Sequence, residues 1–429
     1  MKSQVPKALL VIVSCFALAG FGCRQPAPVK TTTTTNLVVW GLWENSDTMD
    51  PILRAFKDQT GISVEYKKIA SIATYEKTLL EALASGRGPD VFVINNGWVD
   101  AHKDILSPAP ATVINPAQLQ NEFVDVVGTD VVRNNLIYAL PTSVDTLALY
   151  VNTNIFNADG IAQMPKLWAD FQNDVTTITK VSRLGTIDQS GAAIGTASNV
   201  NRAPDVLQLL MMQSGLPIVD TSHSDKRIDI ANAQGERALT FYTEFANKSK
   251  QVYTWDSSQD YSIDAFAEGK TAMMFNYSYQ IPTVRAKNPR LQFAIAPMPQ
   301  IDDGSTGHPQ ATFASYWPYA VSASSKSPAA AWQFVRFLTS QKNADTVNKA
   351  EGIPPARRDS IAQYNADPIM VVFAQQSLKA VSWPRVDIDA TDAIFTSMID
   401  SVATGGASVS DVLKQGQDQL QRIISGNAQ

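Results

Sequence analysis

The sequence predicts an α/β protein whose first part contains a doubly wound, mostly parallel sheet. The runs LVVWGLW (37–43), ISVEY (62–66) and VFVI (91–94) are short and apolar, as strands are. Segments with helical spacing lie between them, and VFVI has the continuous apolar character of a parallel strand covered on both faces. Strands that alternate with helices in this way are typical of an open sheet with helices on both faces.

Two helices are expected between these strands. The first is predicted to begin at Asp50, which can cap it, with Pro51 in its first turn, and to end at Gly61. The second is predicted from Tyr75, and Gly86 is expected to end it.

The later part of the chain has a less regular pattern. Two strand-like runs lie within 137–156, and further strands are predicted within 291–299 and 317–323. The segment 160–290 has mainly helical patterns, and 329–339 is predicted as an amphipathic helix. The last ninety or so residues are predicted to be helical, with loops between the helices.

Composition limits the classes of function. The chain has 429 residues, which is long enough for two or three domains, and its formal net charge is −5. It contains no long run of basic residues, so a nucleic-acid partner is not expected. The three histidines are far apart and lack metal-ligand spacing, so neither a metal nor another cofactor is expected.

The N-terminus has the features of a secretory signal. Lys2 and Lys7 precede an apolar run over 8–22, which has small residues before its end. The run is shorter than the roughly 20 apolar residues that span a membrane. Residues 1–22 are therefore predicted to be a signal peptide, with an uncleaved anchor as the alternative.

Cys23 follows this run and resembles the lipidated first residue of a mature bacterial lipoprotein. The family usually has Leu three residues earlier, where this chain has Gly20, and Cys15 is the alternative. Residues 23–36 contain prolines and a threonine run, which predicts an extended tether. Because Cys15 and Cys23 are the only cysteines, no internal disulfide is expected in the mature chain.

Several sequence blocks resemble the extracellular solute-binding proteins of bacterial ABC importers, in particular the sugar-binding, maltose-binding-protein-like group. The blocks include VVWGLWENSDTMDPILRAFKDQTGISVEY, LLEALASGRGPDVFVIN, FAEGKTAMMFNYSYQ and WPYAVSASSKSPAAAWQFVRFLTSQ. They occur in the family's order and extend over about residues 37–425.

The resemblance implies a two-lobed periplasmic-binding-protein fold of the type II kind, with a hinge of crossing segments. The N-terminal lobe would contain 37–146 and 292–338, and the C-terminal lobe 150–288 and 342–429. The crossings are expected near 146–150, 288–292 and 338–342. Ligands of open α/β sheets bind beyond the carboxyl ends of the strands, where a second lobe can enclose them.

Candidate ligand-binding residues follow the first strands. A sugar site needs aromatic faces and planar polar groups that pair with hydroxyls. Trp43 and Glu44 follow the first strand at a position where the family often contacts its ligand. Asn96 and Trp98 follow VFVI, although the Asn-Asn-Gly run there also suits a plain turn.

Three further candidates lie in the middle of the chain. Asp145 precedes the first expected crossing and can accept two hydroxyls, but it can equally be a hinge residue bonded to backbone. Trp255 precedes a short helix, and Tyr277 lies in the loop after AMMF, where the family presents aromatic residues to its ligand.

The last candidates lie in the final third. Trp317 matches a place where the family has an aromatic residue before a strand, and it could stack on a sugar ring. Trp383 and Arg385 resemble part of a C-terminal loop that closes the cleft, and Arg385 could donate two hydrogen bonds. The alternative is a surface loop whose tryptophan fills the core.

These observations predict a monomeric, exported, lipid-anchored protein that captures a carbohydrate and delivers it to the membrane subunits of an ABC importer. A peptide, polyamine or anion is the alternative ligand, and a scaffold lipoprotein with the same fold is a third possibility. No catalytic residues are expected, since G-x-S-x-G, Walker-type and G-x-G-x-x-G motifs are all missing. An acid pair for glycoside hydrolysis is the remaining enzymatic alternative.

Overall fold

A computed structural model describes residues 35–220, 226–302 and 309–426. The predictions for the signal peptide, for Cys23 and for nearly all of the tether lie outside these ranges. Residues 35–429 form one compact unit. Within the described ranges, no helix has the length and apolar character needed to cross a membrane.

The first large sheet is mostly parallel at its N-terminal strands. Its order is β2 (Ser63–Lys68), β1 (Asn36–Gly41), β3 (Val91–Val93), β17 (Tyr319–Ser322) and β4 (Leu106–Ser107), with β7 (Ala139–Leu140) also paired to β17. β1 is parallel to β2 and β3, whereas β17 is antiparallel to β3. The predicted parallel strands are therefore confirmed, and a strand from much later in the chain extends their sheet.

The second large sheet has the order β10 (Lys180–Val181), β11 (Ile187–Ala192), β14 (Thr271–Asn276), β9 (Ala148–Asn152) and β15 (Phe293–Ala296). A small sheet of β18 (Ala380–Val381), β16 (Thr312–Ser315) and β8 (Asp145–Thr146) lies where the chain passes between the large sheets, because β8 directly precedes β9 and β16 precedes β17. Two short hairpins, β5 (Val132–Arg133) with β6 (Leu136–Ile137) and β12 (Val219–Asp220) with β13 (Arg227–Ile228), complete the strands.

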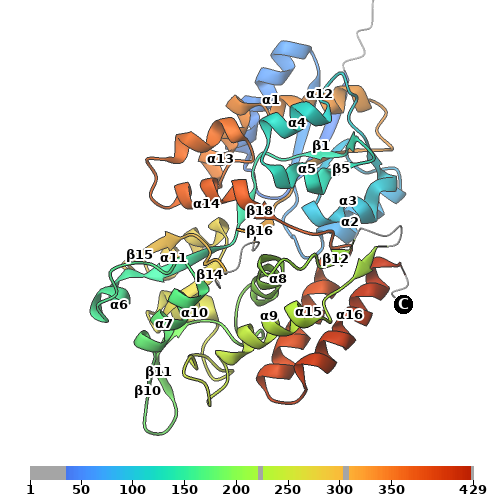
Figure 1. Ribbon diagram of the computed structural model, residues 1–429. Helices are drawn as coiled ribbons and strands as arrows, with labels where there is room; N and C mark the ends of the chain where they lie inside the picture. The colour runs from blue at the N-terminus through green and yellow to red at the C-terminus, as the bar shows by residue number, and fades with distance from the viewer. Residues whose placement is uncertain (1–34, 221–225, 303–308, 427–429) are drawn as a thin grey trace, which may run out of the picture. The chain divides into compact units, whose positions relative to one another are not determined.

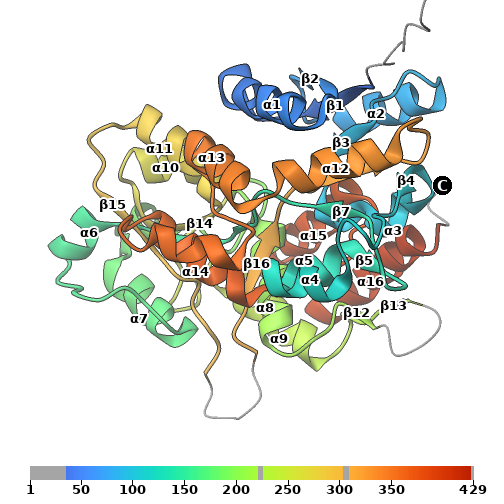
Figure 2. The same ribbon diagram turned by 90° about the horizontal axis from the view of Figure 1, so that it is seen from above.

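We call the first sheet and the helices that accompany it the first lobe (Figure 1, upper part). α1 packs against β2, α12 packs against β17, and α13 packs against both of these helices. Figure 2 shows α1, α2 and α12 grouped around β1 and β3. The helices of this lobe are α1 (Ser46–Thr60), α2 (Tyr75–Ala84), α3 (Val99–His102), α4 (Pro116–Glu122), α5 (Asp125–Val131), α12 (Pro328–Leu338), α13 (Gln341–Glu351) and α14 (Met370–Gln376).

The second sheet and its helices form the second lobe (Figure 1, lower part). α7 packs against β11 and α10 against β14, while α15 packs against α8, α9 and α16. The helices are α6 (Thr153–Ala158), α7 (Trp168–Ile178), α8 (Ala203–Gln213), α9 (Ala233–Glu244), α10 (Ser262–Ala267), α11 (Ile281–Lys287), α15 (Ile388–Ala403) and α16 (Val409–Ile424). Short 3-10 turns η1 (Asn96–Trp98), η2 (Lys103–Ile105), η3 (Ser278–Gln280), η4 (Arg358–Tyr364) and η5 (Ser377–Lys379) lie in the connections.

The predicted start of the first helix at Asp50 is wrong. Asn45 is the N-cap, the helix begins at Ser46, and Pro51 lies inside it. A proline inside a helix removes one backbone hydrogen bond. The apolar side of α1 is buried and includes Phe56, whose ring packs against Phe334 of α12 with centroids 5.2 Å apart. Burial of this face offsets the lost hydrogen bond. The predicted end of the helix is confirmed by the left-handed Gly61.

The mainly helical reading of 160–290 missed β11, whose sequence IDQSGA has no apolar alternation. The lobe boundaries stay a prediction, but strand pairing alters one of them. β15 pairs with β9 in the second sheet, so 293–296 is better assigned to the second lobe than to the first. We therefore place that crossing between β15 and β16.

Candidate functional site

Three tryptophans meet at one edge of the first sheet, and we call Trp43, Trp98 and Trp317 the tryptophan cluster. Trp43 follows β1, Trp98 follows β3, and Trp317 precedes β17, which runs antiparallel to β3. The ring centroids of Trp43 and Trp98 lie 5.4 and 5.1 Å from that of Trp317, in edge-to-face geometry. The predicted positions beyond the strand ends therefore bring these three rings together.

The cluster combines a solvent-facing ring with an unpaired donor. Trp43 is 41% exposed, whereas Trp98 is only 5% exposed. The Nε1–H of Trp98 is buried and has no hydrogen-bond partner within the described part of the chain. A buried indole N–H usually has a partner. The cluster can thus offer a ring face and one donor to a ligand.

Glu44 lies beside the cluster and is held by two phenols. It is 5% exposed, and the hydroxyls of Tyr66 and Tyr319 donate to its two carboxylate oxygens at 2.9 and 2.7 Å. These bonds fix the carboxylate at the carboxyl edge of the first sheet. Glu44 can still accept a further hydrogen bond, since each carboxylate oxygen has two acceptor sites.

Asn96 takes part in a buried network around Asp130, which the sequence did not single out. Asn96 Nδ2 and the Tyr316 hydroxyl donate to Asp130 Oδ2 at 2.9 and 2.7 Å, and the Ser382 hydroxyl donates to Oδ1. Burial raises the pKa of Asp130 to about 6, although these hydrogen bonds act in the opposite direction. The neighbouring Asn95 accepts from Gly97 N, which confirms turn chemistry at that residue.

The facing edge of the second sheet contains a buried ionic cluster. The Tyr277 hydroxyl donates to Asp205 Oδ2 at 2.7 Å, and Asp205 also pairs with Arg202 and, at 3.3 Å, with Arg385. Burial, together with the charge of Asp205, raises the pKa of Asp392, the second carboxylate of this cluster, to about 6. The two cations are therefore paired with carboxylates inside the protein.

Tyr277 itself is fully buried, but its neighbour Tyr279 is not. The two rings stack with centroids 5.6 Å apart, and Tyr279 is 50% exposed. Arg202 has φ +61° at the N-cap of α8, a conformation that a non-glycine residue seldom adopts. Strained residues of this kind concentrate at functional sites. Arg202 and Tyr279 are thus candidates that sequence reasoning missed, because a single Arg or Tyr in a loop gives no pattern.

Residues 382–385 connect the two lobes. Ser382 donates to Asp130 of α5, and Trp383 Nε1 donates to Gln208 Oε1 of α8 at 2.7 Å. Arg385 is 2% exposed. Its backbone nitrogen lies close to Gly97, since a Cβ added to Gly97 would be 3.1 Å from Arg385 N. The buried Trp383 favours the core-filling alternative, and Arg385 pairs with carboxylates of its own chain.

Asp145 and Trp255 form hydrogen bonds with groups of the protein itself. Asp145 accepts from the backbone N–H groups of Thr146 and Ser278 at 2.8 and 3.1 Å and from the Ser278 hydroxyl at 2.8 Å. Burial raises its pKa to about 6 despite these bonds. Trp255 is fully buried and donates to Asn199 Oδ1 at 3.1 Å. These contacts favour the hinge alternative for Asp145 and a core role for Trp255.

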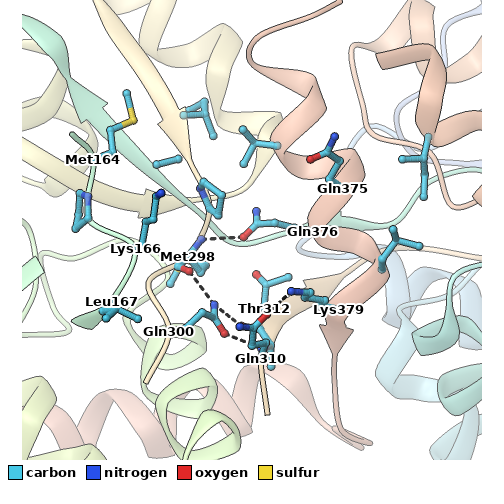
Figure 3. A pocket seen from close by; sticks show the side chains of 18 of the residues that line it. Met164, Lys166, Leu167, Met298, Gln300, Gln310, Thr312, Gln375, Gln376 and Lys379 are labelled. Atoms are coloured by element: carbon cyan, nitrogen blue, oxygen red, sulfur yellow. Dashed lines mark hydrogen bonds between the residues drawn. The ribbon is translucent and has the colours of Figure 1, made fainter. Parts of the chain in front are cut away.

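A large cavity has walls that contain no residue of the tryptophan cluster. Its volume is ≈ 1250 Å³, and its walls include residues 162–167, the end of β15 and several side chains around α14 and η5 (Figure 3). Gln376 Oε1 accepts from Met298 N at 2.8 Å, and Gln300 Nε2 donates to Met298 O at 2.7 Å, so these amides are already paired. No aromatic side chain and none of the ten predicted residues is among those that line it. Its chemistry therefore differs from that of the tryptophan cluster.

Within the described residues, no group of three or more His, Cys, Asp or Glu side chains could hold a metal ion. Two of the three histidines, at positions 223 and 308, lie outside the described ranges. His102 pairs through Nε2 with Glu76 Oε1 at 2.8 Å.

Two α/β lobes with crossing segments between them define a two-domain binding-protein fold. Residues 43–345 match the family of bacterial extracellular solute-binding proteins, and the chain belongs to this family.

Relatives and solved structures agree with this assignment. The chain is 22% identical to the galactooligosaccharide-binding protein of Bacillus subtilis (strain 168), over 97% of each chain. It is 23% identical to the diacetylchitobiose binding protein DasA of Streptomyces coelicolor, over 74% of this chain and 72% of that protein. A cyclo/maltodextrin-binding protein solved with maltotetraose has a TM-score of 0.76 at 19% identity, over 92% of this chain and 98% of that one. This likeness confirms the predicted two-lobed α/β fold.

Proposed function

We propose that this protein binds a carbohydrate between its lobes and delivers it to an ABC importer. The tryptophan cluster carries the proposal, because it combines the half-exposed indole of Trp43 with the buried, unpaired indole N–H of Trp98, and both rings contact Trp317. Aromatic faces contact the C–H surfaces of sugars, and buried donors that lack a partner favour a ligand hydroxyl. The relatives named for galactooligosaccharide and diacetylchitobiose binding support the same ligand class.

The proposed site uses Trp43, Glu44, Asn96, Trp98 and Trp317 from the first lobe. From the second lobe we propose Tyr279 instead of Tyr277, which is fully buried, and Arg202 instead of Arg385, which is 2% exposed. An anionic ligand is less favoured, since Arg202 and Arg385 already pair with Asp205. No catalytic role is proposed.

The proposed mechanism is closure driven by the ligand. A ligand favours the closed arrangement only to the extent that it binds this arrangement better than the open one. The importer's membrane subunits would then recognise the closed protein. We also propose that the protein is an exported monomer and that lipidation at Cys23 holds it at the outer face of the cytoplasmic membrane.

A thermal-shift panel of galactooligosaccharides, diacetylchitobiose, maltodextrins, peptides and polyamines tests the ligand class. A sugar at 100 times its Kd should add about 2.7 kcal/mol of stability, which raises Tm by several degrees. Trp43→Ala should abolish the shift and change the Tm of the free protein little, because Trp43 is 41% exposed. Trp255→Phe is the matched control and should keep the shift. A shift with amines and none with sugars would refute the carbohydrate proposal.

A further inference from the structure

One ionic contact joins the two lobes beside the tryptophan cluster. Asp100 of α3 in the first lobe pairs with Arg133 of the same lobe, with Nε–Oδ1 and Nη2–Oδ2 distances of 2.5 and 3.1 Å. Lys226, directly before β13, donates to Asp100 Oδ2 at 2.7 Å. We call these three residues the ion bridge; α3 and β12 mark its surroundings at the right of Figure 1.

The ion bridge is partly withdrawn from water. The side chains of Asp100, Arg133 and Lys226 are 13%, 21% and 40% exposed. Burial alone would raise the pKa of Asp100, but hydrogen bonds from Arg133 and Lys226 outweigh it and lower this pKa. Asp100 is therefore charged at neutral pH. A pair of this kind is stronger than an exposed surface pair and still responds to salt.

The bridge connects elements that belong to the proposed site and to the C-terminal helices. Trp98 is the N-cap of α3, so Asp100 lies in the first turn after the tryptophan cluster. On the other side, Gln421 of α16 accepts from Ile228 N of β13 at 2.8 Å. The ion bridge thus connects α3, which begins next to Trp98, with β13, which is bonded to α16.

The lobes are not closely packed around the bridge. A cavity of ≈ 720 Å³ is lined by Asp100, Arg133 and Lys226 and also by Trp383 and Pro384. A contact made across such a space depends on the relative position of the lobes. The Asp145–Ser278 contact differs, because Asp145 directly adjoins the crossing from β8 to β9. A hinge rotation alters separations between the lobes least for residues that adjoin the crossing.

We propose that Asp100 is a positioning residue for ligand binding, and that its pair with Lys226 holds the lobes in the arrangement described. The expected effect on ligand binding rests on the proposed function. The expected effect on the lobe arrangement of the free protein does not depend on it. Because the bridge is ionic, the lobe arrangement should depend on salt even when the ligand is uncharged. Loss of the bridge should weaken sugar binding without removing any group that contacts the sugar.

Lys226→Gln tests the inference, because it removes the contact between lobes and leaves Asp100 paired with Arg133. Lys287→Gln is the matched control, since Lys287 pairs with Asp264 inside the second lobe at 2.5 Å. Small-angle scattering of the free proteins is measured in 20 and 500 mM NaCl. The radius of gyration of the wild type and of Lys287→Gln should rise with salt, and that of Lys226→Gln should be raised already at low salt.

Titration calorimetry with maltotetraose as the probe gives the second readout. Lys226→Gln and Asp100→Asn should each weaken binding about fivefold at low salt, the lower end of typical coupling between sites, and the double variant should be no weaker than either. Scattering that is independent of salt in the wild type, or Lys226→Gln that behaves like Lys287→Gln, would overturn the inference. If the scattering behaves as expected and no sugar of the thermal-shift panel binds, the bridge between the lobes stands, whereas the carbohydrate proposal and the positioning role of Asp100 toward a sugar both fail.

Discussion

Asp130 shows how one buried carboxylate shapes the first lobe's side of the proposed site. It accepts from Asn96, Tyr316 and Ser382, so it links the turn after β3 to the segment before β17 and to residues 382–385. Its pKa is raised by burial from 3.8 to about 6. Asp130 is therefore ionised above about pH 6, and keeping this buried carboxylate charged lowers the stability of the folded state.

The sign of this cost predicts a pH effect. A carboxylate with a raised folded-state pKa binds its proton more tightly when folded, so its contribution to stability falls as pH rises from about 4 to about 6. The whole effect is about 3 kcal/mol at most. Relative to the wild type, Asp130→Asn should gain about 2 kcal/mol of stability between pH 4.5 and 7, the part of the effect that falls in this range, in addition to a constant loss from altered hydrogen bonds.

Urea unfolding of both proteins at several pH values measures this difference. Asp125→Asn is a suitable control, since Asp125 is exposed on the same helix and pairs with Arg358. Stability curves of Asp130→Asn and the wild type that stay parallel from pH 4.5 to 7 would contradict the raised pKa.

At the scale of elements, two glycines of the first lobe should respond in opposite ways to the same substitution. A Cβ on Gly97 of η1 would lie 3.1–3.3 Å from Arg385 atoms, two of them in the backbone. Gly97→Ala should therefore cost about 1–3 kcal/mol, as overpacking does. Gly128 lies inside α5 with nothing within 4 Å of an added Cβ, so Gly128→Ala should gain about 0.5–1 kcal/mol from helix propensity.

Chemical denaturation of the two variants measures both changes. The pair distinguishes crowding against residues 382–385 from a general effect of alanine in this lobe. Equal effects of the two substitutions would show that Arg385 does not pack on η1 as described.

The elements that sequence reasoning predicted correctly are those with strong local patterns. β1, β3 and α12 have apolar runs or amphipathic spacing, and Gly61 ends α1 as expected. β11 was missed because Ser190 and Gly191 make its contacts through hydrogen bonds with Thr254, which leave no apolar pattern. The start of α1 was misplaced because Pro51 is tolerated inside a well-packed helix.

For the candidate site, the sequence allowed us to predict which residues follow or precede strands. It did not allow us to predict which side chains form hydrogen bonds or ion pairs with one another. Trp43, Trp98 and Trp317 could be named because they flank predicted strands of one sheet. Arg385 could be named from its loop, but its pairing with Asp205 of α8 depends on a contact between segments 180 residues apart. Tyr279 and Arg202 needed the structure, since backbone conformation and ring stacking determine which of several neighbouring side chains is exposed.

For the whole molecule, the two lobes are joined by more than the crossing chain. Asp145 bonds to η3, residues 382–385 bond to α5 and α8, and Arg385 lies against Gly97. Most of these contacts are buried and polar, so they require that both lobes be folded at once. The chain should therefore unfold as one cooperative unit despite its two sheets.

Differential scanning calorimetry of the wild type should show a single transition whose calorimetric and van't Hoff enthalpies agree. Arg385→Met should lower stability by about 3–5 kcal/mol, because it leaves Asp205 in the buried charge cluster of the second lobe with one cation fewer. The transition should stay single, because the bonds of Ser382 and Trp383 that link the lobes remain. Arg336→Met is the control, since Arg336 pairs with Glu122 within the first lobe. That variant should keep one transition, because the contacts between the lobes remain. Two resolved transitions in the wild type would show that the contacts made by residues 382–385 and by Asp145 do not couple the lobes.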